Sequence, residues 1–397
     1  MALPTLGPVP KSEEEIIATS RERSVDSLDV YRLNVRTGRK TLLTGTRPPR
    51  VERFLVDSKL EPRIAIADIK GTVQNAVYHR RDATSPWEEL HRYDTTRGPV
   101  LAPVGFRGPD DSTLIVASNA GRNTMALYNY DPASKKMGEL LAEHPRFDLG
   151  ASQDGATIPG LVIDNDKMVG VRVEGDKPST TWLEPSYDRI QQMLDAALPG
   201  NVNEFSRTTD GNRLVVTSYS DREPTRWYLL DEQKKTLEDL VSSMPWIKKE
   251  NLVEQRPFLL KTRDGLEIPS YYFLPQNHKP GVRLPTVLYI HGGPGLRADF
   301  WGFRRGFGTL TAQFLASRGY AVIVPNFRIT PGLGSKVFYS GFGSIGKQMI
   351  EDHEDAVRWA VDQGFTDPSK VCIYGGSYGG YATLCQWQRL RISINAG

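Results

Sequence analysis

The sequence predicts a partial β-propeller of about five blades followed by an α/β domain with a mainly parallel sheet. Two observations lead to this prediction. An aromatic residue recurs with a period near 50 residues through the first part of the chain, and strands alternate with helices from Phe258 onward. At 397 residues the chain is also too long for one typical domain. We therefore expect a repeat domain at residues 1–250 and an α/β domain at residues 251–397.

The recurring aromatic residue defines the repeat. It follows an apolar, strand-like run and precedes turn residues and a second strand, and successive occurrences lie 46 to 54 residues apart. Short antiparallel strands repeated at about this period are typical of propeller blades, which bury their faces by stacking on neighbouring blades. A β-rich domain without a true repeat is the alternative. The aromatic positions are Tyr31, Tyr78, Tyr128, Trp182 and Tyr228.

The second part of the chain alternates strands with helices, which favours a mainly parallel sheet covered by helices on both faces. It opens with a hairpin over 258–274 that turns at Asp264-Gly265. Apolar runs predict the other strands, and 3.6-residue periodicity ending at glycine predicts the helices. The predicted strands are 286–290, 321–325 and 371–374, and the predicted helices are 310–318 and 348–363.

Composition and charge exclude several function classes. A formal net charge of +3 over 50 basic and 47 acidic residues gives no reason to expect nucleic acid or a membrane surface as a partner. No metal-ligand spacing or phosphate loop is present, so we expect no metal or other cofactor. Of the two cysteines, Cys372 lies in an apolar strand and is expected in the core. Oligomeric state is not readable from the pattern.

The N-terminal residues bear on the compartment. The segment Met1–Pro8 lacks the basic and apolar regions of a signal peptide, so a cytoplasmic location is the default expectation. A secreted protein whose signal peptide had been lost would show the same N-terminal sequence.

The stretch Gly375-Gly-Ser-Tyr-Gly379 places Ser377 between a predicted strand and a predicted helix. This G-x-S-x-G pattern in that context is typical of a nucleophile elbow, where a sharp turn exposes a serine hydroxyl. Gly375, Gly376 and Gly379 are expected because bulkier residues would crowd so tight a turn. The pattern predicts Ser377 as a nucleophile for acyl transfer in an α/β-hydrolase domain.

A second glycine-rich segment, His291-Gly-Gly-Pro-Gly295, directly follows the strand 286–290. Acyl transfer builds negative charge on the carbonyl oxygen, and rigid backbone N–H groups stabilise that charge. We expect the donors to be the N–H groups of Tyr378 and Gly293. His291, Gly292, Pro294 and Gly295 complete this oxyanion loop, with His291 fixing the loop rather than acting as the base.

Together these motifs resemble the prolyl oligopeptidase family of serine peptidases, on its acylaminoacyl-peptidase and dipeptidyl-peptidase side. The resemblance implies hydrolysis of short peptides, a propeller that filters substrates by size, and a Ser–Asp–His triad with Ser377 as nucleophile. The sequence departs from the family pattern at residues 329–334, where the family has a more glycine-rich loop. The residues that carry the resemblance are 291–295, 314–322, 326–328, 367–371 and 375–381.

The triad is incomplete in this sequence. In α/β-hydrolases the acid and the base follow the nucleophile along the chain. All six histidines precede Ser377, and residues 381–397 contain no His, Asp or Glu. We therefore expect a fragment, cut at both ends, with an incomplete hydrolase domain and little activity alone.

Two other functions stay open. An esterase could share this sheet, although it would need no propeller. A non-catalytic propeller module that binds peptides or proteins would explain the missing base, although it would not need a strained serine turn.

Overall fold

The computed structural model describes residues 5–10, 12–108, 110–164, 167–208, 211–304 and 307–394. The chain forms two compact units, residues 1–160 with 165–168 and residues 161–164 with 169–397. This division falls inside the predicted repeat region, so a domain boundary near residue 250 stays a prediction.

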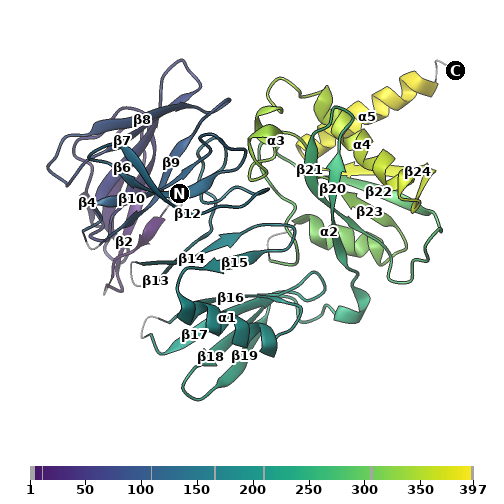
Figure 1. The fold of residues 1–397 in the computed structure, drawn as a ribbon, viewed down its shortest axis with the longest axis horizontal. Helices are drawn as coiled ribbons and strands as arrows, with labels where there is room; N and C mark the ends of the chain where they lie inside the picture. The colour runs from purple at the N-terminus through teal and green to yellow at the C-terminus, as the bar shows by residue number, and fades with distance from the viewer. Residues whose placement is uncertain are drawn as a thin grey trace. The chain divides into compact units, whose positions relative to one another are not determined.

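The first unit contains three four-stranded antiparallel sheets in which strand order follows chain order (Figure 1). Apolar residues on the inner strands are buried, because each sheet packs one face against hydrophobic neighbours. The strands are β1 (Thr5–Pro8), β2 (Glu15–Ser20), β3 (Asp29–Asn34) and β4 (Lys40–Leu42); β5 (Val51–Val56), β6 (Pro62–Asp68), β7 (Gln74–His79) and β8 (Glu88–Asp94); and β9 (Leu101–Arg107), β10 (Thr113–Ser118), β11 (Ala126–Asp131) and β12 (Lys136–Ala142).

The second unit begins with two further sheets of the same kind, of three and four strands. Five such sheets in succession confirm the prediction of about five blades. Helix α1 (Pro185–Ala197), which the sequence reading did not predict, packs Ile190 and Leu194 onto the last of them. The strands are β13 (Leu161–Asp164), β14 (Lys167–Val173) and β15 (Ser179–Trp182), then β16 (Val202–Arg207), β17 (Arg213–Tyr219), β18 (Arg226–Asp231) and β19 (Thr236–Ser242).

Every recurring aromatic residue lies on the third strand of its sheet. Each is paired with a small or β-branched residue on the second strand, which leaves room for the ring at a directly opposed position. The repeat in the sequence is therefore a repeat in strand register. The pairs are Tyr31 with Ala18, Tyr78 with Ala65, Tyr128 with Val116, Trp182 with Gly170 and Tyr228 with Val216.

The α/β sheet has five strands in the order β20-β21-β23-β22-β24, of which β23, β22 and β24 are parallel. The predicted hairpin is confirmed, with its turn at Gly265 in the left-handed region (φ 86°). The elements are the short helix η1 (Lys249–Asn251), β20 (Gln255–Lys261), β21 (Glu267–Phe273), β22 (Leu284–Ile290), α2 (Phe307–Ala316), β23 (Ala321–Val324), α3 (Ser335–Tyr339), α4 (Gln348–Asp362), β24 (Thr366–Gly375) and α5 (Tyr378–Ile394).

Helices cover both faces of this sheet (Figure 1). Alternate residues of β21 show the two sides: Tyr271 and Phe273 belong to one core cluster with Ala312 of α2. The intervening Tyr272 faces Trp359 of α4, with ring centroids 5.3 Å apart. The predicted layered arrangement is thus confirmed.

The expectation that Cys372 lies in the core is wrong, because its side chain is exposed. It belongs to β24, the last strand of the sheet, which pairs with β22 along one edge. Among the described residues no strand pairs with the other edge of β24. An apolar sequence predicts a buried strand only where neighbours cover it, and here Tyr374 is exposed as well.

Candidate active site

Ser377 lies at the turn between β24 and α5, with its side chain exposed. Its φ of 55° is in the left-handed region, which costs a residue with a Cβ on the order of 1–2 kcal/mol. Such strain persists only where the surroundings impose it. The strand–turn–helix context that the sequence predicts is therefore present, with the serine at its apex.

The two outer glycines of the turn lie against the end of β22. A Cβ on Gly375 would stand 2.6 Å from the carbonyl oxygen of Ile290, and a Cβ on Gly379 would be closer still to the same atom. A Cβ on Gly376 would meet nothing within 4 Å. Close backbone approach therefore explains the requirement for glycine at 375 and 379, but not at 376.

The loop 291–295 lies beside the turn because β22 and β24 are parallel neighbours, with Ile290 in register with Gly375. A Cβ on Gly292 would stand 3.3 Å from the Cβ of Ser377 and 3.8 Å from its Oγ. Gly293 has φ 136°, a conformation that L residues rarely adopt. The structure thus brings together the two motifs that were singled out separately in the sequence.

Tyr378 follows the serine and anchors the start of α5. Its side chain is buried, with its ring 4.9 Å from that of Phe327, and burial raises the pKa of its hydroxyl. The hydroxyl lies 3.2 Å from Nε2 of His353 on α4. The side chain is therefore held inward, so that only the main chain of Tyr378 is available at the turn.

His353 is fully buried, and burial lowers the pKa of its imidazole to about 3, with the charge of His291 as a second cause. Its polar partner is Tyr378 rather than the serine. In the part of the chain that the structure describes, the Ser377 hydroxyl has no hydrogen-bond partner. None of the histidines of that part is placed as its base.

Sequence reading missed a buried polar group that is linked to the loop 291–295 through Asn326. Asp299 accepts a hydrogen bond from Nδ2 of Asn326, and Arg297 lies 3.5 Å from its other oxygen. Asn326 in turn faces His291, with Oδ1 3.3 Å from Nε2. A single aspartate 27 residues from its partner along the chain leaves no local pattern, so only the fold reveals it.

A neighbouring polar network fixes the chain after β23. Arg328 donates to Asp352 on α4 through its backbone N–H (3.0 Å) and its guanidinium (2.7 Å), and reaches Asp264 at the hairpin turn (3.0 Å). Ile329 follows with φ 76°, a strained value for a β-branched residue. This is where the sequence departs from the glycine-rich loop of the family it resembles.

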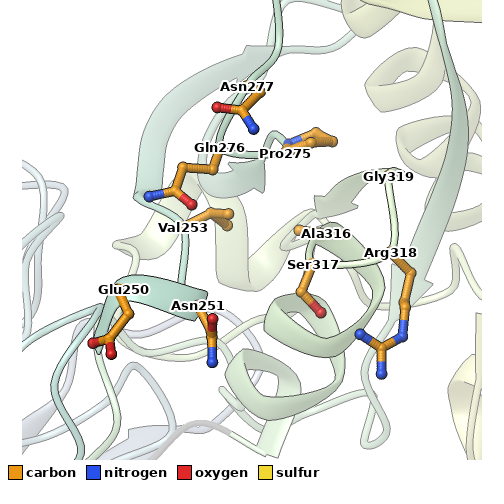
Figure 2. A pocket seen from close by; sticks show the side chains of 10 residues that line it. All are labelled: Glu250, Asn251, Val253, Pro275, Gln276, Asn277, Ala316, Ser317, Arg318 and Gly319. Atoms are coloured by element: carbon orange, nitrogen blue, oxygen red, sulfur yellow. The ribbon is translucent and has the colours of Figure 1, made fainter. Parts of the chain in front are cut away.

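A cavity of about 440 Å³ lies elsewhere in the second unit (Figure 2). Its lining includes Glu250 and Arg318, and no residue of the elbow or of the loop 291–295. The described residues contain no cluster of three or more His, Cys, Asp or Glu side chains that could hold a metal ion. Among those residues, no helix is long and apolar enough to span a membrane.

Comparison with known proteins matches residues 306–389 to the model of the prolyl oligopeptidase family. The chain is 32% identical to dipeptidyl aminopeptidase BIII of Pseudoxanthomonas mexicana, over 95% of this chain and 53% of that protein. It is 26% identical to dipeptidyl peptidase family member 6 of Caenorhabditis elegans, over 90% of this chain and 50% of that protein.

Solved structures show the same fold. Puromycin hydrolase matches with a TM-score of 0.64 at 17% identity, over 95% of this chain and 58% of that one. Dipeptidyl peptidase 4 of Porphyromonas gingivalis matches with a TM-score of 0.60 at 14% identity, over 90% of this chain and 50% of that one. The chain spans about half the length of the curated relatives it matches. At residues 306–389 the sequence matches the prolyl oligopeptidase family, and over most of its length it is similar to dipeptidyl aminopeptidase BIII, while the solved structures show a shared fold.

Proposed function

We propose that Ser377 is the nucleophile of a peptidase that cleaves short peptides, with the backbone N–H groups of Tyr378 and Gly293 as oxyanion donors. The observation that carries the proposal is the approach of Gly292 to Ser377 across β22 and β24, where a Cβ would stand 3.8 Å from Oγ. An exposed hydroxyl on a strained turn, next to a rigid glycine loop, suits attack on a carbonyl carbon.

In this reaction Oγ adds to the scissile carbonyl carbon, the C–N bond breaks, and the amine leaves with a proton. Water then hydrolyses the acyl-serine. Both steps need a base that removes a proton from the attacking oxygen. The two backbone donors stabilise the intermediate oxyanion, and one such donor contributes about 3 kcal/mol.

We also propose that residues 1–397 alone hydrolyse peptides only feebly. The sequence has no histidine after Ser377, and in the described part no histidine contacts its hydroxyl. Loss of the base costs a serine peptidase several powers of ten in rate, because the attacking hydroxyl keeps its proton. Slow attack by the unassisted Ser377 hydroxyl is the activity expected here.

The test is turnover of dipeptidyl nitroanilides, a choice that the names of the two curated relatives support. We expect slow release that is lost in Ser377→Ala. A rate unchanged in Ser377→Ala would contradict the assignment of the nucleophile. Turnover on the order of 10 s⁻¹, ordinary for an enzyme, would contradict the feeble activity while supporting Ser377.

In the described part of the chain the Ser377 hydroxyl has no hydrogen-bond partner. This observation favours a second candidate function. This is a module that binds peptides without cleaving them. Equal binding of fluorescent peptides by the natural chain and by Ser377→Ala, with no acyl-serine formed by the natural chain, would support it. Parallel assays with an aryl ester and a nitroanilide distinguish an esterase from a peptidase.

A further inference from the structure

A second cavity, of about 400 Å³, lies between helix α2 and the segment 246–252 that precedes β20. Its wall on α2 carries Leu310 and Phe314, which share one face of the helix because they are four residues apart. Another face of α2 packs Ala312 and Ala316 into the core beside the sheet. The cavity therefore borders a side of the helix that the sheet does not cover.

Gln313 on α2 holds the two walls of this cavity together. Its side chain is 2% exposed and accepts a hydrogen bond from the backbone N–H of Val253 (2.9 Å). Its Nε2 donates to the carbonyl oxygens of Val253 (2.7 Å) and Asp221 (2.8 Å). A buried amide with three backbone partners is costly to move. The end of the segment 246–252 is therefore anchored on the helix.

Large apolar side chains gather at this cavity although they face solvent. Trp246 is 75% exposed and Phe314 is 60% exposed, and Leu310, one helical turn from Phe314, is 41% exposed. Exposed apolar side chains that gather in one place are typical of binding sites, whereas single scattered ones need no explanation. The volume also falls in the range of small-ligand pockets, about 300–1,000 Å³.

Among the described residues, the charged side chains that line this cavity are both basic, Lys248 on the segment and Arg318 after α2. The guanidinium of Arg318 lies over the ring of Phe314, 5.2 Å from the ring centroid. Within the described ranges, neither basic side chain forms a hydrogen bond or an ion pair. Glu250 lines only the adjoining cavity, which shares Arg318 (Figure 2). The charge of the lining therefore suits an anion.

We propose that this cavity binds a small carboxylate that carries an aromatic ring. The ring packs against Trp246 and Phe314, where aromatic contact adds to the burial of apolar surface. The carboxylate accepts hydrogen bonds from the planar guanidinium of Arg318, and Lys248 supplies a second positive charge. The site is separate from Ser377, because no residue of the serine turn or of the loop 291–295 lines it. It does not depend on the proposed function.

The direct test is ¹⁹F NMR of the natural chain labelled with 5-fluorotryptophan and titrated with N-acetyl-phenylalanine. The Trp246 signal is identified through Trp246→Phe. We expect this signal to shift with a Kd of about 1 mM or below. The uncharged amide of the same compound should bind about fivefold more weakly, because it lacks the negative charge. A Trp246 signal that stays unchanged at about 10 mM acid would overturn the proposal.

Surface variants test the charged and the apolar part of the site separately. Arg318→Gln should weaken binding of the acid about fivefold and leave binding of the amide nearly unchanged, whereas Phe314→Ala should weaken both alike. Arg283→Gln, at an exposed arginine that lines neither cavity, is the matched control.

Two results would contradict the role of the positive charge: equal binding of acid and amide, or equal effects of Arg318→Gln and Arg283→Gln. Tighter binding of decanoate than of N-acetyl-phenylalanine would assign the cavity to aliphatic chains and overturn the aromatic class of ligand.

Discussion

Ile290 at the end of β22 lies in parallel register with Gly375 at the end of β24, and its carbonyl oxygen faces the α-carbons of both Gly375 and Gly379. This single contact joins the serine turn to the glycine loop. It turns two short motifs, 80 residues apart in the sequence, into one site.

Replacing Gly379 by alanine should therefore destabilise the α/β domain. The new methyl group would overlap the Ile290 carbonyl, and backbone on both sides prevents easy relief. Overpacking of this kind costs typically about 1–3 kcal/mol, and more where backbone must move. Urea unfolding measures the loss. Gly376→Ala is the control, because its Cβ would meet nothing within 4 Å; equal losses in both variants would contradict the account.

Ile329 should be strained, because its φ of 76° is unfavourable for a β-branched residue. Ile329→Ala and Ile329→Gly both remove the side chain, but only glycine also removes the Cβ. We expect the glycine variant to be more stable than the alanine variant by about 1 kcal/mol. Chemical denaturation of these two variants measures the difference in their free energies of unfolding, which reports the backbone strain alone. An alanine variant as stable as the glycine variant would argue against strain.

The pairing of Trp182 with Gly170 makes a prediction for the repeat region. A Cβ on Gly170 would stand 2.6 Å from the indole ring. Gly170→Ala should therefore cost about 1–3 kcal/mol. If the cause is the ring, combining the change with Trp182→Leu should recover part of the loss. Thermal unfolding of Gly170→Ala, Trp182→Leu and the double variant is the measurement. If the stability lost in the double variant equals the sum of the losses in the two single variants, this clash is excluded.

His353 makes stability fall on acidification. The pKa of its imidazole is lowered to about 3 in the fold from 6.5. Between these two pH values His353 is therefore protonated in the unfolded chain but neutral in the folded one. Stability is then fully present above about pH 6.5 and falls by up to about 1.4 kcal/mol per pH unit below it. Comparing urea unfolding at pH 7.5 and 5.0 measures the slope.

In His353→Gln the slope should be shallower, with a remainder from His79, whose pKa is also lowered, to about 4. An unchanged slope in His353→Gln would show that His353 titrates normally in the fold.

The sequence predicted the features that carry a local pattern. The aromatic repeat fell on the third strand of each sheet because alternation and turn spacing set the register. The serine turn followed from glycine spacing between a strand and a helix. Helix α1 was missed although Pro185 at its start and the four-residue spacing of Ile190 and Leu194 marked it.

Other features depend on contacts that no local pattern shows. Asp299 and Asn326 meet only in the fold, and Asp352 reaches Arg328 from another element. The exposure of Cys372 depends on what covers β24, not on the residues of β24 themselves. Burial and polar pairing at long range are therefore what sequence reasoning could not supply.

The central claim is that Ser377 is set up to attack an electrophilic centre. Intact-mass and peptide-level mass spectrometry after treatment with an aryl fluorophosphonate tests it most directly, since attack by Oγ releases fluoride and leaves the phosphonate on the serine. We predict one adduct on Ser377, formed ahead of any other serine and absent in Ser377→Ala. An unmodified Ser377, or equal labelling of Ser377→Ala, would contradict the claim.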